Sequence, residues 1–577
     1  MKEMLTKYIR ENNLSPFNQY KTQIESTTNS IYKTKDAKLV HNHVLQKVSQ
    51  HFVFSETSNL FNAIPFTNSS EEIKERQEFF RKIKAMGRKE NNFLNKLKNP
   101  RPTWKPPYDV VVVTEDSNIF NKLREENCPV QMIISENDLA LLETKDLVQV
   151  LNCNEYGLIL ESLPQAVFLK NISEAYLERN LEKLSAWREN IQILKQYELS
   201  QSLGQTISEI EKLLPLIGDK KTGIITRDFV EQKTEEINRN ISSRIKEMTI
   251  SGDTLFAMMN KGVLPPQLKS VVREEIIRSG IPFEVFIEEL PVKIFEEELE
   301  KTIARQSSNE FSNIAEEIKN YSKELKEIPE KLKQLSENIL IFDFFTGISK
   351  FIEAETIFPE YGNEFIMEDS KNIFLDNPQP ISFMLSPEYK CSILTGANSG
   401  GKTTLIEHII QLLSLYQLGL PVSGKIRTPL FTEVYYFAKN KGSANKGAFE
   451  TLLTQMAKIT PGDRTLVLAD EIESVTEPGV AGKIIAATAE YYISKNCYLV
   501  IATHLGQEIQ KTLPAKTRID GIEAKGLTPE FELIVDHNPV LGRLAHSTPE
   551  LIVEKMANSQ NNHYFTHLNN FLKARKL

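Results

Sequence analysis

The sequence predicts a protein of α/β and α class, in which a carboxy-terminal α/β domain follows long helices. Short apolar strands at 390–395, 465–469 and 497–502 each end in small or polar residues. Apolar residues recur at helical spacing between 173 and 248, and a heptad pattern runs from Phe311 to Ile339. A chain of 577 residues is too long for one compact core, so several domains are expected.

The amino-terminal part is predicted to contain two segments. Residues 1–107 read as a helical core segment that ends in a basic stretch, Arg81 to Lys105. Residues 108–172 begin with a buried strand, 109–114, and continue with further apolar runs and helical patterns. Because strands alternate with helices, a small α/β insert is expected. The later apolar runs are 130–134, 157–160 and 166–169.

Residues 173–350 are predicted to form long helical arms. The turn-rich stretch at 251–296 suits the tip of a helical hairpin. The heptad pattern favours a coiled seam, and an ordinary bundle helix is the alternative. Because Pro329 removes a backbone donor inside this seam, we expect the helix to kink or restart near Ile328.

The composition excludes several classes of protein. Lys and Arg total 69 against 77 Asp and Glu, so any contact with nucleic acid must be local. The four cysteines have no paired spacing of the kind that zinc sites or disulfide frameworks need. Neither a signal peptide nor an apolar run that could span a bilayer is recognisable. These features predict a cytoplasmic protein without a membrane partner.

A phosphate-binding loop is predicted after the strand at 390–395. The pattern Gly-x-x-x-x-Gly-Lys-Thr runs from Gly396 to Thr403 and leads into a helical sequence. Backbone amides of such a loop point at phosphates, Lys402 supplies a cation to the outer phosphates, and the Thr403 hydroxyl can bind Mg²⁺. The flanking strand and helix favour this interpretation over a chance glycine-rich turn, so ATP and Mg²⁺ are the predicted ligands. The predicted contacts are Gly396, Ala397, Asn398, Ser399, Gly400, Gly401, Lys402, Thr403 and Thr404.

Two further strand ends carry polar pairs. Asp470 and Glu471 follow the strand at 465–469, where one carboxylate can hold Mg²⁺ and the next can polarise an attacking water. Thr503 and His504 follow the strand at 497–502, at the edge where open α/β sheets bind ligands. His504 is a candidate sensor of the γ-phosphate, and an ordinary surface or core histidine is the alternative. The predicted catalytic residues are Lys402, Glu471 and His504.

The motifs TGANSGGKTTL, LVLADEIESVTEPGVAG and VIATH, in this order, resemble those of the MutS family of DNA-binding ATPases. The resemblance implies that residues 351–577 form an ATPase and dimerisation domain, a P-loop variant of the ABC type. It further implies a homodimer in which each nucleotide site is completed by the partner subunit. Residues 173–350 would be the lever arms with a clamp at their tip, and residues 108–172 are similar in class to the family's connector.

The sequence departs from the family pattern in three places. The first hundred residues contain no convincing counterpart of the Phe-x-Glu wedge of members that read mismatches. Where the family has a Ser-Thr-Phe segment that reaches the partner's nucleotide, Gly447 replaces the serine while Phe449 is retained, and Ser443 or Asn445 are the alternatives. The chain ends without the small nuclease domain of some bacterial paralogues. It therefore resembles the short archaeal-type paralogue of the second MutS branch.

The resemblance implies binding of duplex or branched DNA with little sequence specificity, and a role in DNA repair or recombination together with other proteins of those pathways. In a prokaryote the protein would be associated with the nucleoid. Local candidates for phosphate contacts are the stretch Arg81 to Lys105 and the cluster Lys261, Lys269 and Arg273, although such clusters are often solvated faces. The alternatives are an ABC-type ATPase that acts on ribosomes or a protein complex, and a coiled-coil tether.

Overall fold

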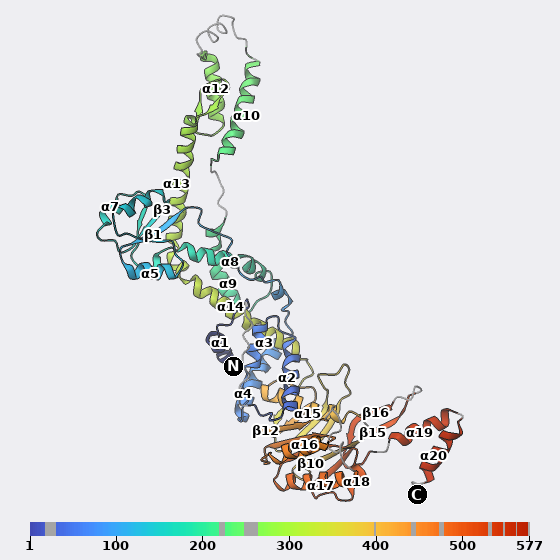
Figure 1. Cartoon of the computed structure of the whole chain (residues 1–577). Helices are drawn as coiled ribbons and strands as arrows, with labels where there is room; N and C mark the ends of the chain where they lie inside the picture. Colours follow the sequence, from blue (N-terminus) through green and yellow to red (C-terminus); the bar gives the residue numbers. More distant parts are fainter. Residues whose placement is uncertain are drawn as a thin grey trace. The chain divides into compact units, whose positions relative to one another are not determined.

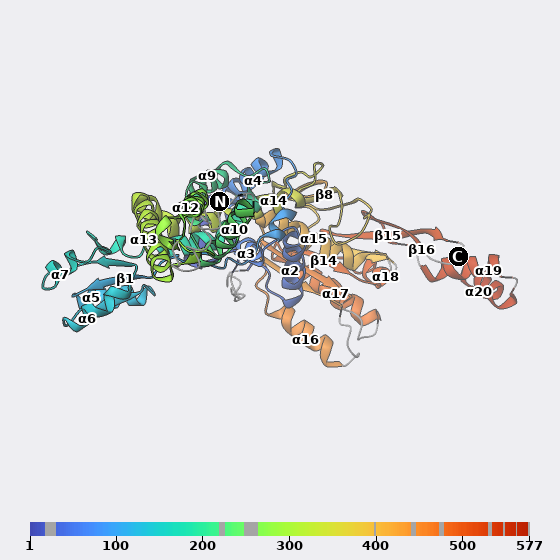
Figure 2. The same ribbon diagram turned by 90° about the horizontal axis from the view of Figure 1, so that it is seen from above.

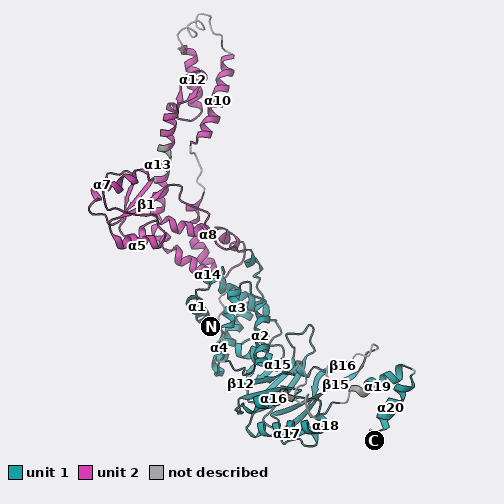
Figure 3. Cartoon of the chain, viewed as in Figure 1, with its two compact units in different colours: residues 1–96, 336–577 teal, residues 97–335 magenta. Residues whose placement is uncertain are grey.

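The computed structural model contains two compact units (Figure 3). Unit 1 comprises residues 1–96 and 336–577, and unit 2 comprises residues 97–335. The structure describes residues 1–17, 30–218, 225–246, 248, 264–396, 400–439, 446–471, 478–528, 533–545, 548–560 and 562–574. Within these ranges, none of the helices combines the length and apolar character needed to cross a membrane. The four segment boundaries given above stay predictions.

The amino-terminal helices of unit 1 pack on the carboxy-terminal domain. Two of them begin with a capping hydroxyl: Thr34 accepts a hydrogen bond from the backbone of Ala37, and Ser69 from that of Glu72. Helix α2 buries valines at helical spacing against α15, which lies beside it in Figure 1. The elements are α1 (Lys2–Glu11), α2 (Lys35–Ser49), α3 (Ser55–Asn62), α4 (Ser70–Ala85) and the 3-10 helix η1 (Asn92–Lys96).

A six-stranded sheet forms the centre of the carboxy-terminal domain, in the order β12-β13-β14-β10-β15-β16. The first five strands are parallel and β16 is antiparallel to β15. Strands β13 and β14 are fully buried, which explains their apolar sequences. The strands are β10 (Cys391–Gly396), β12 (Glu433–Phe437), β13 (Thr465–Asp470), β14 (Tyr498–Ala502), β15 (Thr517–Leu527) and β16 (Leu533–Val540).

The remaining elements of unit 1 surround this sheet. Strands β15 and β16 extend beyond their neighbours toward α19 and α20 (Figure 1 and Figure 2). A second sheet has the order β7-β11-β8-β9. The elements are β7 (Glu360–Tyr361), β8 (Phe365–Ser370), β9 (Ile381–Leu385), α15 (Lys402–Leu418), β11 (Lys425–Thr428), α16 (Lys446–Ala457), α17 (Pro478–Ser494), α18 (Gly506–Gln510), α19 (Thr548–Ser559) and α20 (His563–Ala574).

Unit 2 contains a small parallel sheet in the order β2-β1-β3-β4. The predicted apolar run at 157–160 is a helix in the structure, and strand β3 was not predicted. The polar side chain of Gln149 interrupts the apolar pattern of β3, although it is buried and accepts a hydrogen bond from the Tyr176 backbone at 2.7 Å. The elements are β1 (Val110–Thr114), α5 (Ser117–Glu125), β2 (Val130–Met132), α6 (Asn137–Ala140), η2 (Leu141–Thr144), β3 (Leu147–Val150), α7 (Gly157–Glu161), β4 (Ala166–Phe168) and η3 (Ile172–Glu174).

Long helices make up the rest of unit 2, as the helical periodicity predicted. Part of the predicted hairpin tip, 251–263, lies outside the described residues, and the part from 264 onward forms α12 and a short hairpin. The elements are α8 (Glu178–Leu194), α9 (Gln201–Glu211), η4 (Leu214–Ile217), α10 (Arg227–Lys246), α12 (Pro266–Arg278), η5 (Phe283–Val285), β5 (Phe286–Ile287), β6 (Lys293–Ile294), α13 (Glu296–Asn320) and α14 (Ser322–Phe351).

The helix was predicted to kink or restart near Ile328; the restart is wrong, and the kink stays a prediction. The helical seam is interrupted at Tyr321, between α13 and α14, and Pro329 lies inside α14. A proline at this position leaves the Leu325 carbonyl without its helical donor. The buried Asn180 side chain donates to that carbonyl at 3.0 Å, so the helix continues past the proline with the carbonyl satisfied.

Candidate nucleotide site

The predicted site residues follow three adjacent strands of the central sheet. Strands β13, β14 and β10 are neighbours and run parallel, so their carboxyl ends meet at one edge. Gly396 ends β10, Asp470 ends β13, and Thr503 follows β14. The Thr503 backbone amide donates to the Leu394 carbonyl at 2.9 Å and extends this pairing beyond the strands.

Glycines shape the connection between β10 and α15. Gly396 has a φ of 133°, and a β-carbon there would lie 2.4 Å from the Ile522 carbonyl oxygen, so a side chain does not fit. Gly401 has a φ of 93° and directly precedes α15. Ala397, Asn398 and Ser399 lie outside the described residues. What the structure describes of the predicted phosphate loop is thus Gly396, Gly400 and Gly401.

Lys402 and Thr403 begin α15, and Thr404 follows them, half-buried. The buried Lys402 ammonium donates to the Gly396 carbonyl at 2.8 Å, across the loop. The Thr403 hydroxyl donates to Oδ2 of Asp470 at 2.5 Å. The first residues of the helix and the end of β13 therefore bring one ammonium, one hydroxyl and one carboxylate together.

Asp470 offers an oxygen that no described residue uses. The residue is buried, and its Oδ1 atom lacks a hydrogen-bond partner among the described residues. Burial and the neighbouring charge of Glu471 raise the pKa of Asp470, against the opposing effects of Thr403 and Lys402. A buried, unpaired carboxylate oxygen is costly without a cation. The Asp470 carboxylate and the Thr403 hydroxyl are hard oxygen ligands that fit Mg²⁺.

Glu471 is held by two basic side chains. Its backbone has a φ of 48°, and its amide donates to the Ala502 carbonyl at 2.9 Å. His504 Nε2 donates to Oε1 at 2.7 Å, and Lys439 forms an ion pair with Oε2. Burial pushes the pKa of Glu471 upward, but Lys439 and His504 outweigh it and lower the pKa. Glu471 is therefore an ionised carboxylate in this arrangement.

Sequence reasoning missed two residues of this edge. Lys439 follows β12, the next strand of the sheet, and could have been predicted as a polar residue after a strand end. Lys441 lies two residues further along, and the sequence alone does not distinguish between the two lysines. His537 lies on β16, and its Nδ1 donates to the Gly400 carbonyl at 2.9 Å. Nothing in the sequence links β16 to the loop, because their contact depends on the pairing of β15 with β16.

The comparisons identify relatives over most of the chain. The protein named DNA-binding protein MutS2 from Pyrococcus furiosus is 29% identical over 566 residues, which cover 90% of this chain and 96% of that protein. The Endonuclease MutS2 of Enterococcus faecalis is 23% identical over 396 residues, or 64% of this chain and 48% of that protein. The Endonuclease MutS2 of Aquifex aeolicus is 28% identical over 166 residues, or 27% and 21%. No family model matches the chain.

The chain is homologous to MutS2 proteins, with one match that covers 90% of it, and this is consistent with a paralogue of the MutS family. These relatives carry the name MutS2, which agrees with the resemblance to the second MutS branch. The near-complete match is with the P. furiosus protein, whereas the two bacterial proteins match over less than half of their own length.

The segment that the MutS resemblance places against the partner's nucleotide lies partly outside the described residues. Ser443 and Asn445 lie outside the described residues. Gly447 and Phe449 belong to α16, but the structure does not describe what surrounds them. The residue that reaches a partner's nucleotide therefore stays a prediction.

Among the described residues of the first hundred, 1–17 and 30–100, the Phe-x-Glu pattern of mismatch-reading MutS proteins occurs without an exposed glutamate. The triplet Phe54-Ser55-Glu56 has the required pattern, but it lies at the start of α3 and Glu56 is buried. A buried glutamate cannot contact a base pair.

Many of the predicted DNA-contacting cations are engaged within the protein. In unit 2, Lys269 and Arg273 both form ion pairs with Glu288, while Lys261 lies outside the described residues. In unit 1, the Arg81 guanidinium lies 4.5 Å from the centre of the Phe358 ring. The ion pairs weaken the case for the cluster Lys261, Lys269 and Arg273, because Glu288 offsets part of its positive charge.

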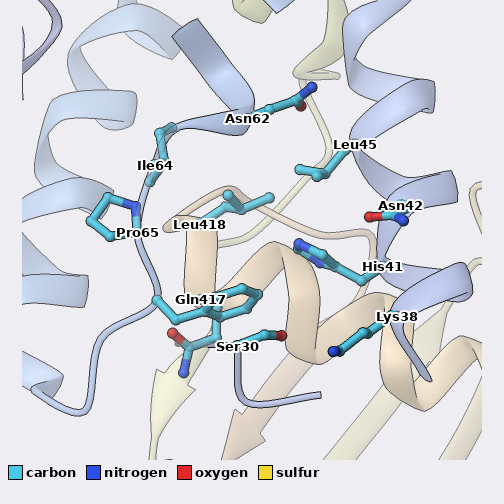
Figure 4. Close-up of a pocket in the computed structure, with 11 residues that line it drawn as sticks. Ser30, Lys38, His41, Asn42, Leu45, Asn62, Ile64, Pro65, Gln417 and Leu418 are labelled. Atoms are coloured by element: carbon cyan, nitrogen blue, oxygen red, sulfur yellow. The ribbon is translucent and has the colours of Figure 1, made fainter. Parts of the chain in front are cut away.

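A separate cavity lies at the other end of α15. Its volume is about 340 Å³, and Gln417, Leu418 and the buried His41 line it (Figure 4). The His41 ring packs against Tyr32 and Phe66, with 5.0 Å between ring centres in both cases. Burial lowers the pKa of His41 to about 4. The cavity contains no predicted site residue, so it is distinct from the nucleotide site.

Proposed function

We propose that this protein hydrolyses ATP and binds DNA with little sequence specificity. The enzymatic part rests on a cluster of side chains at one edge of the central sheet. The Thr403 hydroxyl is hydrogen-bonded to Asp470, whose second carboxylate oxygen has no hydrogen-bond partner among the described residues, and Glu471 is the next residue. The name of the P. furiosus relative supports the DNA-binding part.

Each residue has a proposed task in hydrolysis. Lys402 and the loop amides bind the outer phosphates of ATP. Thr403 and Asp470 would hold Mg²⁺, which supplies positive charge to the phosphate oxygens when it is bound. Glu471 orients the attacking water and accepts its proton, and His504 holds the carboxylate in place.

The contacts of Glu471 have a consequence for this mechanism. Because Lys439 and His504 lower its pKa, Glu471 is a weak base in the arrangement described. Proton transfer requires that its carboxylate loses part of this stabilisation. We infer that Lys439 separates from Glu471 before water is activated.

The quaternary part of the proposal is a homodimeric clamp. Two ATPase domains would face each other, each completing the other's nucleotide site, and the nucleotide state would control closure of the arms about DNA. Such control requires that the open and closed states differ in their contacts with nucleotide. The resemblance to MutS supports this arrangement.

Local positive charge supports DNA contact at the stretch from Arg81 to Lys105. It contains nine Lys and Arg and a single glutamate, in a chain whose net charge is −8. Neutralisation of phosphates by such residues makes binding sensitive to salt. The proposed role in repair or recombination rests on the MutS2 names of the relatives.

The test is ATP hydrolysis by the purified protein with duplex, branched and single-stranded DNA, together with a salt titration of DNA binding. We expect Glu471→Gln to lower kcat by roughly 10²- to 10⁴-fold while nucleotide still binds. Glu433→Gln is the matched control, because Glu433 begins β12 at the opposite edge of the same sheet.

Three outcomes would change the proposal. Hydrolysis that survives in Glu471→Gln removes that residue from the mechanism. Hydrolysis that is indifferent to every DNA, without salt-sensitive binding, indicates a ribosome or protein complex as the partner instead. A monomer at concentrations where hydrolysis is maximal contradicts the shared nucleotide site.

A further inference from the structure

The excess negative charge of the chain is concentrated in the insert, residues 108–172. This segment contains eleven Asp and Glu against four Lys and Arg, a net charge of −7 out of −8 for the whole chain. The rest of the protein is almost neutral. A polyanion such as DNA is repelled by the insert, so its surface fits a different kind of partner.

Exposed apolar side chains gather at the carboxyl edge of the insert's sheet. Ile134 follows β2 and is 73% exposed, and Leu158, on α7 after β3, is 82% exposed. Ile159 is 44% exposed. The Tyr156 hydroxyl lies 3.4 Å from the Ile134 carbonyl oxygen and brings the two loops together. We call Ile134, Tyr156, Leu158 and Ile159 the edge patch.

The loops that carry the edge patch are fixed by two carboxylates. Glu115, after β1, accepts hydrogen bonds from the backbone amides of Asn154 at 2.8 Å, Glu155 at 3.0 Å and Tyr156 at 2.8 Å. Asp138 accepts from the amide of Ile134 at 2.9 Å and from the next amide at 2.8 Å. The apolar side chains are therefore held outward before any partner binds, which lowers the entropic cost of binding.

The same contacts argue against a small ligand at this edge. Open α/β sheets bind ligands beside the carboxyl ends of their strands, through polar groups that point outward. Here the carboxylates of Glu115 and Asp138 are used by backbone amides. Burial raises the pKa of the nearby Cys153 thiol to about 11, which disfavours its thiolate form. Recognition at the edge is left to apolar side chains and exposed charge.

We propose that the edge patch docks a basic segment of a partner protein. Apolar side chains of that segment would cover Ile134 and Leu158, while its lysines and arginines would face the exposed Glu136, Glu155 and Glu161 around the patch. Charge complementarity selects this occupant, and grouped exposed apolar residues mark interaction sites. The inference does not depend on ATP hydrolysis or on DNA binding.

The experiment measures binding of a defined probe to the full chain by fluorescence anisotropy. The probe is a labelled peptide of alternating lysine pairs and leucine pairs, and two counterparts replace every lysine by glutamate or every leucine by serine. We expect the basic apolar peptide to bind and both counterparts to fail. Ile134→Glu combined with Leu158→Glu should weaken binding roughly tenfold or more.

Ile277→Glu is the matched control, because Ile277 is 70% exposed on α12, outside the insert, and should leave binding unchanged. Unchanged melting temperatures of the variants establish that they fold. Equal binding of the serine peptide, or of the doubly substituted chain, would overturn the proposal in favour of plain charge attraction. Loss of a dimer in the double variant would make a second copy the occupant, and loss of DNA affinity would make DNA the occupant; either result overturns it.

Discussion

Two sheets of this protein carry carboxylates beyond the carboxyl ends of their parallel strands and use them differently. At the edge of β13, Asp470 keeps one oxygen that no described residue uses, and basic side chains hold Glu471. At the edge of β1, Glu115 gives its oxygens to three backbone amides of its own fold. Position at a strand end therefore does not make a ligand site; what decides is whether polar atoms remain available after folding.

The largest difference between the two edges should appear when one carboxylate at each edge is replaced by the corresponding amide. Asp470→Asn should lower the rate of ATP hydrolysis roughly a hundredfold or more, because electrostatic stabilisation through a metal is worth several kcal/mol. Glu115→Gln should leave the rate within about twofold, because Glu115 organises only the insert. Initial rates over a Mg²⁺ titration measure both. Equal losses in the two variants would erase the distinction between the edges.

Glycines at the two edges provide a second comparison. Gly396→Ala should cost roughly 2–4 kcal/mol, because its β-carbon would meet the Ile522 carbonyl and its φ is positive. Gly157→Ala should change stability by less than about 0.5 kcal/mol, since a β-carbon there meets nothing within 4 Å. Urea unfolding of both variants gives the difference. A Gly396→Ala protein as stable as the parent would contradict the close approach.

Acid should destabilise unit 1 more than unit 2. All nine histidines lie in unit 1, and burial lowers the pKa of His41 and of His408 to about 4. A lowered pKa contributes stability above the unfolded value near 6.5, and this contribution is lost as pH falls toward 4. Each buried histidine should cost unit 1 about 1 kcal/mol between pH 7 and pH 5.5.

The measurement uses the positions of the tryptophans. Trp104 and Trp187 both lie in unit 2, so their fluorescence reports that unit, while circular dichroism reports the whole chain. Replacing both buried histidines by leucine should flatten the pH dependence seen by circular dichroism, and replacing the exposed His43 by asparagine should not. If the stability of unit 2, followed by tryptophan fluorescence, falls with pH as much as that of the whole chain, groups other than these histidines cause the acid sensitivity.

The smallest expected effect is a shift of the pH profile when Lys439, which pairs with Glu471 at the nucleotide edge, is replaced. Lys439→Met removes a partner that lowers the pKa of Glu471, so that pKa should rise. Since the base acts when ionised, the acidic limb of the kcat/KM profile, which reports the free enzyme, should move to higher pH. Lys458→Met serves as a control for the loss of one positive charge in the same unit. A kcat/KM profile that stays in place would contradict the effect of the ion pair on the pKa of Glu471 in the free enzyme.

The local sequence was sufficient for the nucleotide edge and insufficient for its surroundings. Strands β10, β13 and β14 were predicted within one or two residues, because buried parallel strands are apolar runs that end in functional residues. Lys439 and His537 were not found, because their contacts depend on strand order in the folded sheet. The same limit explains β3, since the partner of Gln149 is far along the chain.

Asn180 and Pro329 have a consequence for the history of the sequence. The side-chain amide of Asn180 stands in for the backbone donor that the proline lacks. A chain that gained the proline first would have left the buried Leu325 carbonyl unsatisfied, at about 1–3 kcal/mol. A chain that gained the asparagine first would have met a smaller obstacle. The two residues are therefore energetically coupled, and replacing Asn180 should cost less stability in a chain that also lacks the proline.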